Sequence, residues 1–231
     1  NARSRHRQTS HEPWTMAEPA ARLYLVTPVL DDDAFAPRLQ EACAAGTVAA
    51  VLLRLAAASE RALVNQVKAL APSVQDHGAA LIVSVEGEAD LATIAARSGA
   101  DGVHVQGSPA RVRELRERLK DGRAIGVGTI RTKDDAMSLG EAGVDYLLFG
   151  EPRPDGSLPS LESVVERAAW WAEIFETPCV AYAPGLDAIP ALVATRAEFI
   201  ALSDAVWSHE GGPAEGVAAA IERIGTAEGE R

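Results

Sequence analysis

The sequence has few of the features that mark secreted, membrane-spanning or nucleic-acid-binding proteins. Only two cysteines, Cys43 and Cys179, occur in 231 residues. That excludes a disulfide framework and predicts buried thiols in a reducing, cytoplasmic compartment. No run of 18 apolar residues is present, so we expect no transmembrane helix. Lysine and arginine number 22 against 33 acidic residues, a net charge of −11 without basic runs, so neither nucleic acid nor a membrane surface is an expected partner.

The first 16 residues differ in character from the rest of the chain. They read NARSRHRQTSHEPWTM and combine three arginines with no apolar stretch and no periodicity, so they do not resemble a secretory signal. We expect residues 1–20 to be a disordered N-terminal extension, residues 21–226 one folded domain, and residues 227–231 a short tail. An apolar fraction of 47% and a charged fraction of 24% are ordinary for a globular domain of this size.

Short apolar runs recur along the chain and predict buried strands. Most are too continuously apolar to have one solvated face, as is typical of strands in parallel sheets. The eight runs lie at 22–27, 50–55, 80–85, 101–106, 124–129, 144–150, 178–182 and 198–203. Amphipathic segments with helical spacing separate them, among them 60–70, 110–119 and 161–175. Thr132, three residues before Asp135, predicts the start of another helix.

Eight such β-α units in about 200 residues predict a single (β/α)8 barrel, a TIM barrel. The alternative is a doubly wound open sheet, which favours a glycine-rich phosphate turn after its first strand. Here the first run is followed by Thr-Pro-Val-Leu-Asp at 27–31, without glycine. The G-x-G of Gly126 and Gly128 has Arg131 at the third glycine position. The barrel is therefore favoured.

In a TIM barrel the active site lies at the carboxyl ends of the strands. The candidate ligand-binding residues at these positions are Arg54, Ser84, His104, Gln106, Thr129, Arg131, Arg153, Tyr182, Ser203 and Asp204. Arg131, Lys133 and Arg153 could together form an anion site. Arg54 ends a buried strand, so we expect it to meet either a ligand anion or an internal carboxylate such as Asp204 or Glu86. No metal ligand is predicted beyond Glu86 as a subordinate candidate, and no cofactor is predicted from the residues.

Five strings of the sequence together resemble a known enzyme family. In order they are RLYLVT, SGADGVHVQ, AIGVGT, EAGVDYLLFGEPRP and PCVAYAPGL, within a region from Leu23 to about Ile224. They resemble the thiamine phosphate synthases and their TenI relatives, the thiazole tautomerases. GADGVH at 99–104 is the most specific string. The resemblance implies a (β/α)8 barrel, which agrees with the pattern of runs. It also implies a transferase of thiamine biosynthesis that joins hydroxymethylpyrimidine diphosphate to thiazole phosphate, with Mg²⁺ and a cationic clamp on the departing diphosphate.

Carried over position by position, the resemblance also predicts departures from that chemistry. The strand-two motif Q-L-R-x-K keeps Arg54 but has Leu52 for its Gln and Ala56 for its Lys. Val85 and Pro109 stand where the family has its two magnesium carboxylates. Further replacements are Gly128 for Ser, Ile130 for the tautomerase His, and Asp204 for a Ser at the phosphate site.

We therefore interpret the chain as a diverged, catalytically weakened member of this family, a candidate pseudoenzyme without an assigned catalytic residue. It would bind a small anionic or heterocyclic molecule at the C-terminal face of the barrel. One alternative is an active, Mg²⁺-dependent synthase that uses replacement residues such as Glu86, Arg153 and Asp204. The other is a non-catalytic component of a complex, with Tyr182 and Pro184 plugging the barrel. A homo-oligomer is left open.

Overall fold

The strands close into one barrel in sequence order. The computed structural model describes residues 20–120 and 122–231, so the predicted extension lies outside the described residues, except for the exposed Ala20. All eight strands are parallel, and β1 pairs with β8 to complete the barrel. The strands are β1 (Arg22–Leu30), β2 (Val48–Leu55), β3 (Ala80–Val85), β4 (Gly102–Gln106), β5 (Ala124–Gly128), β6 (Tyr146–Phe149), β7 (Cys179–Tyr182) and β8 (Phe199–Leu202). The predicted TIM barrel is confirmed.

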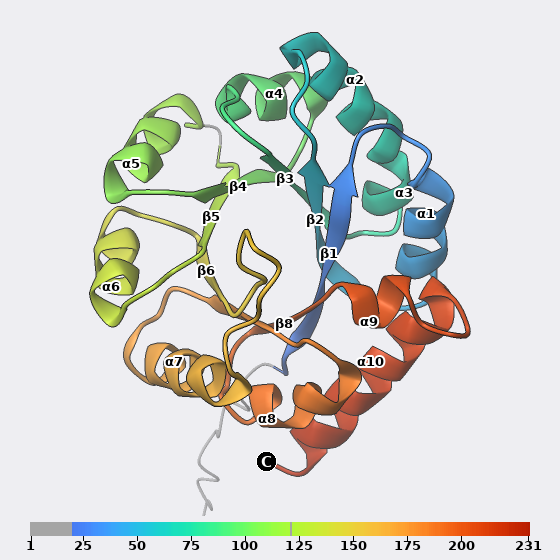
Figure 1. Cartoon of the computed structure of the whole chain (residues 1–231), viewed down its shortest axis with the longest axis vertical. Coiled ribbons are helices and arrows are strands. Elements are labelled where there is room, and N and C mark those ends of the chain that lie inside the picture. Colours follow the sequence, from blue (N-terminus) through green and yellow to red (C-terminus); the bar gives the residue numbers. More distant parts are fainter. Residues whose placement is uncertain (1–19, 121) are drawn as a thin grey trace, which may run out of the picture.

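Helices surround the barrel as a ring (Figure 1). They are α1 (Ala36–Ala44), α2 (Glu60–Leu70), α3 (Pro72–Gln75), α4 (Leu91–Ser98), α5 (Pro109–Arg118), α6 (Lys133–Glu141), α7 (Leu161–Ile174), the 3-10 turn η1 (Leu186–Ala188), α8 (Ile189–Val193), α9 (Asp204–Trp207) and α10 (Pro213–Gly229). The predicted helical segments agree with α2, α5 and α7. Thr132 caps α6 as predicted, because its hydroxyl accepts the N–H of Asp135 at 3.0 Å.

The predicted tail at 227–231 is corrected by the structure, because α10 continues to Gly229. Ala227 is buried. The carboxylate of Glu228 accepts the N–H of Ala21 at 2.6 Å, directly before β1. These contacts with the start of the barrel extend the helix beyond the point at which its polar sequence suggests an end.

Acidic residues form hydrogen bonds between neighbouring strands at the amino-terminal end of the barrel. Each one directly precedes an even-numbered strand and accepts a backbone N–H from the preceding odd-numbered strand. The pairs are Asp101 with Leu81 at 2.7 Å, Asp145 with Ile125 at 2.7 Å, and Glu198 with Cys179 at 2.9 Å. The carboxylates thus satisfy strand donors that the sheet leaves unpaired at this end. Part of the protein's acidity therefore serves the fold.

Two layers of apolar side chains hold the structure together. One lies between the strands and the helices, and the other fills the barrel, because successive residues of a strand point to opposite faces. The buried interior residues are Tyr24, Val26, Ala50, Leu52, Ile82, Tyr146, Leu148, Val180, Tyr182 and Ala201. On β5 the inward positions include Gly126, where a Cβ would overlap the ring of Tyr146. The first glycine of the G-x-G sequence therefore makes room for a tyrosine from β6.

Both cysteines lie between the strands and the helices. Cys43 and Cys179 are buried, which confirms the predicted buried thiols. Burial raises the pKa of Cys43 to about 11. Burial also raises the pKa of Cys179, with a further contribution from the charge of Glu198. None of the helices in the described part of the chain is both long enough and apolar enough to span a membrane.

Candidate functional site

The predicted site residues lie at the carboxyl ends of the strands, but only some of them face the barrel interior. Arg54 on β2, His104 on β4 and Tyr182 on β7 do so, and Ser203 follows β8 in the same alternation. Ser84 on β3 is partly buried and pairs in register with Arg54. The exposed predicted residues are Gln106, Arg131, Arg153 and Asp204. Arg54, His104, Tyr182 and Ser203 define what we call the barrel mouth.

A chain of hydrogen bonds runs from the barrel mouth into the barrel. Nδ1 of His104 lies 2.9 Å from the hydroxyl of Tyr146, which lies 2.6 Å from the hydroxyl of Tyr24. Burial, together with the positive charge of Arg54, lowers the pKa of His104 to about 4. The imidazole is therefore neutral at neutral pH. A neutral imidazole has one donor and one acceptor nitrogen, and Nδ1 is the nitrogen that takes part in this hydrogen-bond chain.

Arg54 has neither of the internal partners considered for it. Within the described residues no carboxylate lies within the 4.0 Å ion-pair distance of its guanidinium. Glu86 is exposed after β3, and Asp204 is exposed as the first residue of α9. The expected place of Asp204 among the inward residues of strand eight is corrected, because the buried Ser203 occupies the inward position. The mouth thus presents a partly buried cation with no carboxylate of the described residues in ion-pair contact, although its charge acts on the nearby Glu151.

The expected anion site of Arg131, Lys133 and Arg153 forms only in part. Lys133 pairs with Glu166 at 3.1 Å and lies 5.1 Å from the ring of Trp170, so it turns away from the strand ends. Arg131 and Arg153 both line a cavity of about 200 Å³ between the loops that follow β5 and β6. Two of the three predicted residues are therefore brought together.

Glu151, which is not among the candidate residues taken from the sequence, also lines this cavity. It comes after β6 and Gly150, whose φ of 96° directs the chain back toward the barrel. Its carboxylate accepts the backbone N–H of Thr129. Burial raises the pKa of Glu151, whereas its own N–H, the N–H and hydroxyl of Thr129 and the charge of Arg54 lower it. In Figure 1 the loop after β6 is drawn across the barrel opening.

The sequence feature that relates to Glu151 is Gly128, a second inward-facing glycine on β5. A Cβ at Gly128 would overlap Oε1 of Glu151 and lie 2.8 Å from Nε2 of His104. Gly128 thus leaves room for a side chain from the next strand, as Gly126 does for Tyr146. The sequence alone shows the glycine but not what fills the space.

Thr129, between Gly128 and this cavity, has an unusual backbone conformation. Its φ is 58°, in the left-handed region that β-branched residues seldom occupy. Its hydroxyl oxygen is buried and makes no hydrogen bond of standard geometry within the described structure, and it lies close enough to the Glu151 carboxyl to lower the pKa of that group. Strained backbone and unpaired buried polar atoms concentrate at functional sites. Thr129 is therefore a stronger site candidate than its sequence position alone indicated.

The residues at the strand ends do not fit a dedicated Mg²⁺ site. In the described ranges no group of three or more His, Cys, Asp or Glu residues is arranged to hold a metal ion. Glu86 and Asp204 are exposed on different loops, and Glu151 is engaged by Thr129. Mg²⁺ needs near-ideal octahedral geometry around oxygen ligands, which this set does not offer. We derive no step through the ion.

A larger cavity, about 590 Å³, opens at the opposite, amino-terminal end of the barrel. Tyr24 and Tyr146 line it, together with small inward residues, including Ala50, Ala80 and Ala124. Active sites of TIM barrels lie at the carboxyl end, so this cavity is not assigned as the candidate site.

Comparisons with known proteins identify the family of the chain and agree with its fold. The profile of a family described as thiamine monophosphate synthase matches residues 23–206. A protein of Rhodospirillum centenum named thiamine-phosphate synthase is 40% identical over 200 residues, covering 85% of this chain and 94% of the relative. A protein of the same name from Hyphomonas neptunium is 34% identical over 214 residues, covering 87% and 92%.

Among solved structures, the thiamine phosphate pyrophosphorylase of Pyrococcus furiosus is similar in fold. Its TM-score is 0.72 at 20% identity, and the match covers 89% of this chain and 96% of that one. The sequence relatives and the profile cover nearly the whole barrel. The chain therefore belongs to the thiamine monophosphate synthase family.

Proposed function

We propose that this barrel binds a small anionic or heterocyclic molecule at its mouth and that its coupling activity is weak compared with an ordinary synthase. Arg54 is the anion contact. Neutral His104, Tyr182 and Ser203 are the hydrogen-bonding groups around it. The proposal assigns no catalytic residue.

The observation that carries the proposal is the unpaired cation at the mouth. Arg54 is partly buried at the inward end of β2, and no carboxylate of the described residues lies within ion-pair distance. Glu151 lies near enough to feel its charge but does not contact it, and a partly buried charge without a contacting partner is costly, so a ligand anion in direct contact would bind favourably. A guanidinium is well suited to this role because it binds phosphate or carboxylate through two parallel hydrogen bonds.

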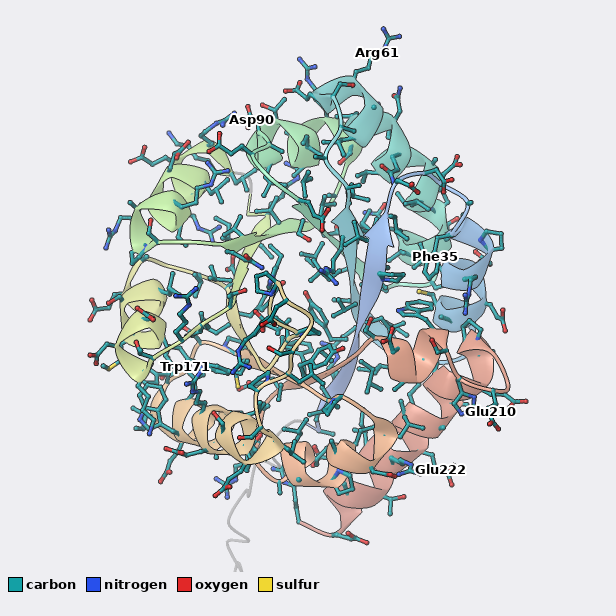
Figure 2. The ribbon with its side chains drawn as sticks, in the orientation of Figure 1. Phe35, Arg61, Asp90, Trp171, Glu210 and Glu222 are labelled. Carbon is teal, nitrogen blue, oxygen red and sulfur yellow. The ribbon has the colours of Figure 1, made fainter. Side chains whose placement is uncertain are left out.

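Calorimetric titration with inorganic phosphate tests this proposal. Arg54→Met should weaken binding by about tenfold or more, the loss expected for one charge-assisted contact. Arg61→Met is the matched control, because Arg61 is an exposed arginine on α2 that points outward in Figure 2. Equal phosphate affinity of the wild type and Arg54→Met would refute the assignment of Arg54.

The second candidate function is an active thiamine-phosphate synthase. It is favoured by the 40% identity with the Rhodospirillum centenum protein of that name. Incubation of purified protein with hydroxymethylpyrimidine diphosphate, thiazole phosphate and Mg²⁺ separates the two candidates. Robust, Mg²⁺-dependent release of diphosphate would establish the synthase and refute weak coupling. Turnover near background, together with phosphate binding through Arg54, is the result that our proposal expects.

A further inference from the structure

The cavity at the amino-terminal end of the barrel exists because the inward side chains there are small. Ala50, Ala80 and Ala124 hold inward positions on β2, β3 and β5 and line the cavity. Between them β4 begins with Gly102. Bulky branched side chains fill the interior of most TIM barrels in packed layers. Here alanine and glycine on four consecutive strands leave about 590 Å³ open.

The remaining wall of this cavity is apolar and partly aromatic. Ile82 of β3, Val180 of β7 and Phe199 at the start of β8 line it. Tyr24 and Tyr146 line it as well, with their ring centroids 5.7 Å apart in an edge-to-face arrangement. The ring of a ligand could pack against these rings in the same way. The volume lies within the roughly 300–1,000 Å³ of small-molecule sites, so a two-ring compound has room.

The two phenol groups in the wall already have hydrogen-bond partners. The hydroxyls of Tyr24 and Tyr146 lie 2.6 Å apart, and that of Tyr146 lies 2.9 Å from Nδ1 of His104. Among the described residues that line the cavity, no buried side-chain nitrogen or oxygen lacks a partner. A polar group of a ligand would therefore lose its contacts with water without gaining a required partner at the wall. The part of the ligand inside the barrel is expected to be apolar.

Two side chains of opposite charge line the cavity, and only the positive one lacks a partner group. The carboxylate of Asp101 accepts the N–H of Leu81 at 2.7 Å and the side-chain amide of Gln75 at 3.1 Å. Arg22 begins β1, and no carboxylate of the described residues lies within 4.0 Å of its guanidinium. This guanidinium lies 5.7 Å from the ring centroid of Phe199, its partner in register on β8. Because β1 and β4 are three strands apart around the barrel, Arg22 and Asp101 lie on different sides of the rim.

We propose that this cavity binds a small two-ring aromatic molecule that carries one anionic group. The rings lie beside the alanines of β2, β3 and β5, and the anionic group lies at the rim against Arg22. A guanidinium suits this role because it donates two parallel hydrogen bonds to a carboxylate. The site does not rest on the function proposed for the mouth, because Arg54 lies at the opposite end of the barrel and does not line this cavity.

Two probes of similar shape separate the contribution of the rings from that of the charge. 2-Naphthoate has two rings and a carboxylate, whereas 2-naphthalenemethanol has the rings without the charge. Binding of each would be measured by titration calorimetry at low salt. The full chain is used, because residues 1–19 precede β1 at this end of the barrel and lie outside the described residues.

Variants that fill the cavity test the position of the rings. Ala80→Leu and Ala124→Leu each place a larger side chain in the open space, so both probes should bind about tenfold more weakly or worse. Ala44→Leu is the matched control, because Ala44 is exposed at the end of α1, and it should match the wild type. Melting temperatures verify folding, and the two cavity variants lie on different strands, so one supplies the test if the other does not fold.

A variant without the charge tests the position of the anionic group. Arg22→Met should weaken 2-naphthoate by about fivefold at low salt, the upper range for an exposed ion pair, and should spare 2-naphthalenemethanol. The loss should shrink in high salt, because Arg22 is exposed and salt screens exposed charges. Arg61→Met, which removes an exposed arginine of α2, should match the wild type for both probes.

The proposal is overturned if 2-naphthoate does not saturate the wild type at millimolar concentrations. It is also overturned if the folded leucine variants, or Arg22→Met at low salt, bind 2-naphthoate as well as the wild type does. Arg54→Met should retain wild-type affinity for 2-naphthoate, and a loss there would place the probe at the mouth instead. The phosphate titration reports on Arg54, so failure of one site with the other intact distinguishes the two proposals.

Discussion

The hydroxyl groups of Tyr24 and Tyr146 lie 2.6 Å apart inside the barrel, although 122 residues separate them in the sequence. Tyr146 also lies 2.9 Å from Nδ1 of His104, so one hydroxyl serves two buried partners. The three side chains belong to β1, β6 and β4. This network therefore links strands on different sides of the barrel and connects its centre with the candidate site.

Replacement of Tyr146 by Phe should destabilise the protein by about 1–3 kcal/mol, because it leaves the Tyr24 hydroxyl and one nitrogen of His104 buried without a partner. Urea unfolding would measure the loss. Adding Tyr24→Phe should cost less in the Tyr146→Phe background than in the wild type, because the unpaired phenol is then removed. Wild-type stability of Tyr146→Phe would show that the network contributes nothing to folding.

The low pKa of His104 predicts a loss of stability in mild acid. Its folded pKa is about 4, below the ordinary value of 6.5. Between these values the unfolded chain gains a proton that the folded chain does not. Above pH 6.5 this residue therefore leaves the free energy of unfolding unchanged. As the pH falls from 6.5 toward 4 the free energy of unfolding declines, by about 2 kcal/mol at pH 5. Unfolding of the wild type and His104→Gln at pH 7 and pH 5 would isolate it, since the variant should lose less stability. Parallel pH dependence of the two proteins would argue against a buried neutral His104.

Serine at position 128, the residue expected from the family motif, should not be tolerated beside Glu151. Its Cβ would overlap Oε1 of Glu151 and lie 2.8 Å from Nε2 of His104. We expect Gly128→Ser to destabilise the wild type by about 1–3 kcal/mol, as overpacking does. The loss should be smaller in a Glu151→Ala background, which removes the carboxylate. Thermal unfolding of the four proteins in this double-mutant cycle would measure the coupling, and equal losses in both backgrounds would mean that the two positions are independent.

Neither thiol should react with a polar disulfide reagent while the chain is folded. Cys43 and Cys179 are buried, and burial raises the pKa of Cys43 to about 11, so little of the reactive thiolate forms at neutral pH. Titration with Ellman's reagent should detect no thiol in native protein and two after denaturation. Rapid reaction of the native protein would contradict the packing described for α1 and β7.

The strands and most helices follow from local properties of the sequence. Continuous apolar runs predicted all eight strands, and the segments at 60–70, 110–119 and 161–175 agree with α2, α5 and α7. These predictions succeed because the side-chain period of a strand or helix is a property of the chain itself. The number and alternation of the elements then favoured the closed barrel, and the end of each strand identified Arg54 and His104 as candidates.

The positions and partners of the site residues depend on contacts between segments whose relative placement cannot be read from the sequence. Whether Arg54 meets Asp204, and whether Ser203 or Asp204 faces inward, is decided by how β8 ends in α9. The place of Glu151 is decided by space beside Gly128, and the end of α10 by a bond to Ala21. Periodicity and strand order thus come from the sequence, whereas the partners of individual charges come from tertiary packing. The reason is that ion pairs and steric clearance depend on distances of a few ångströms between residues far apart in the chain.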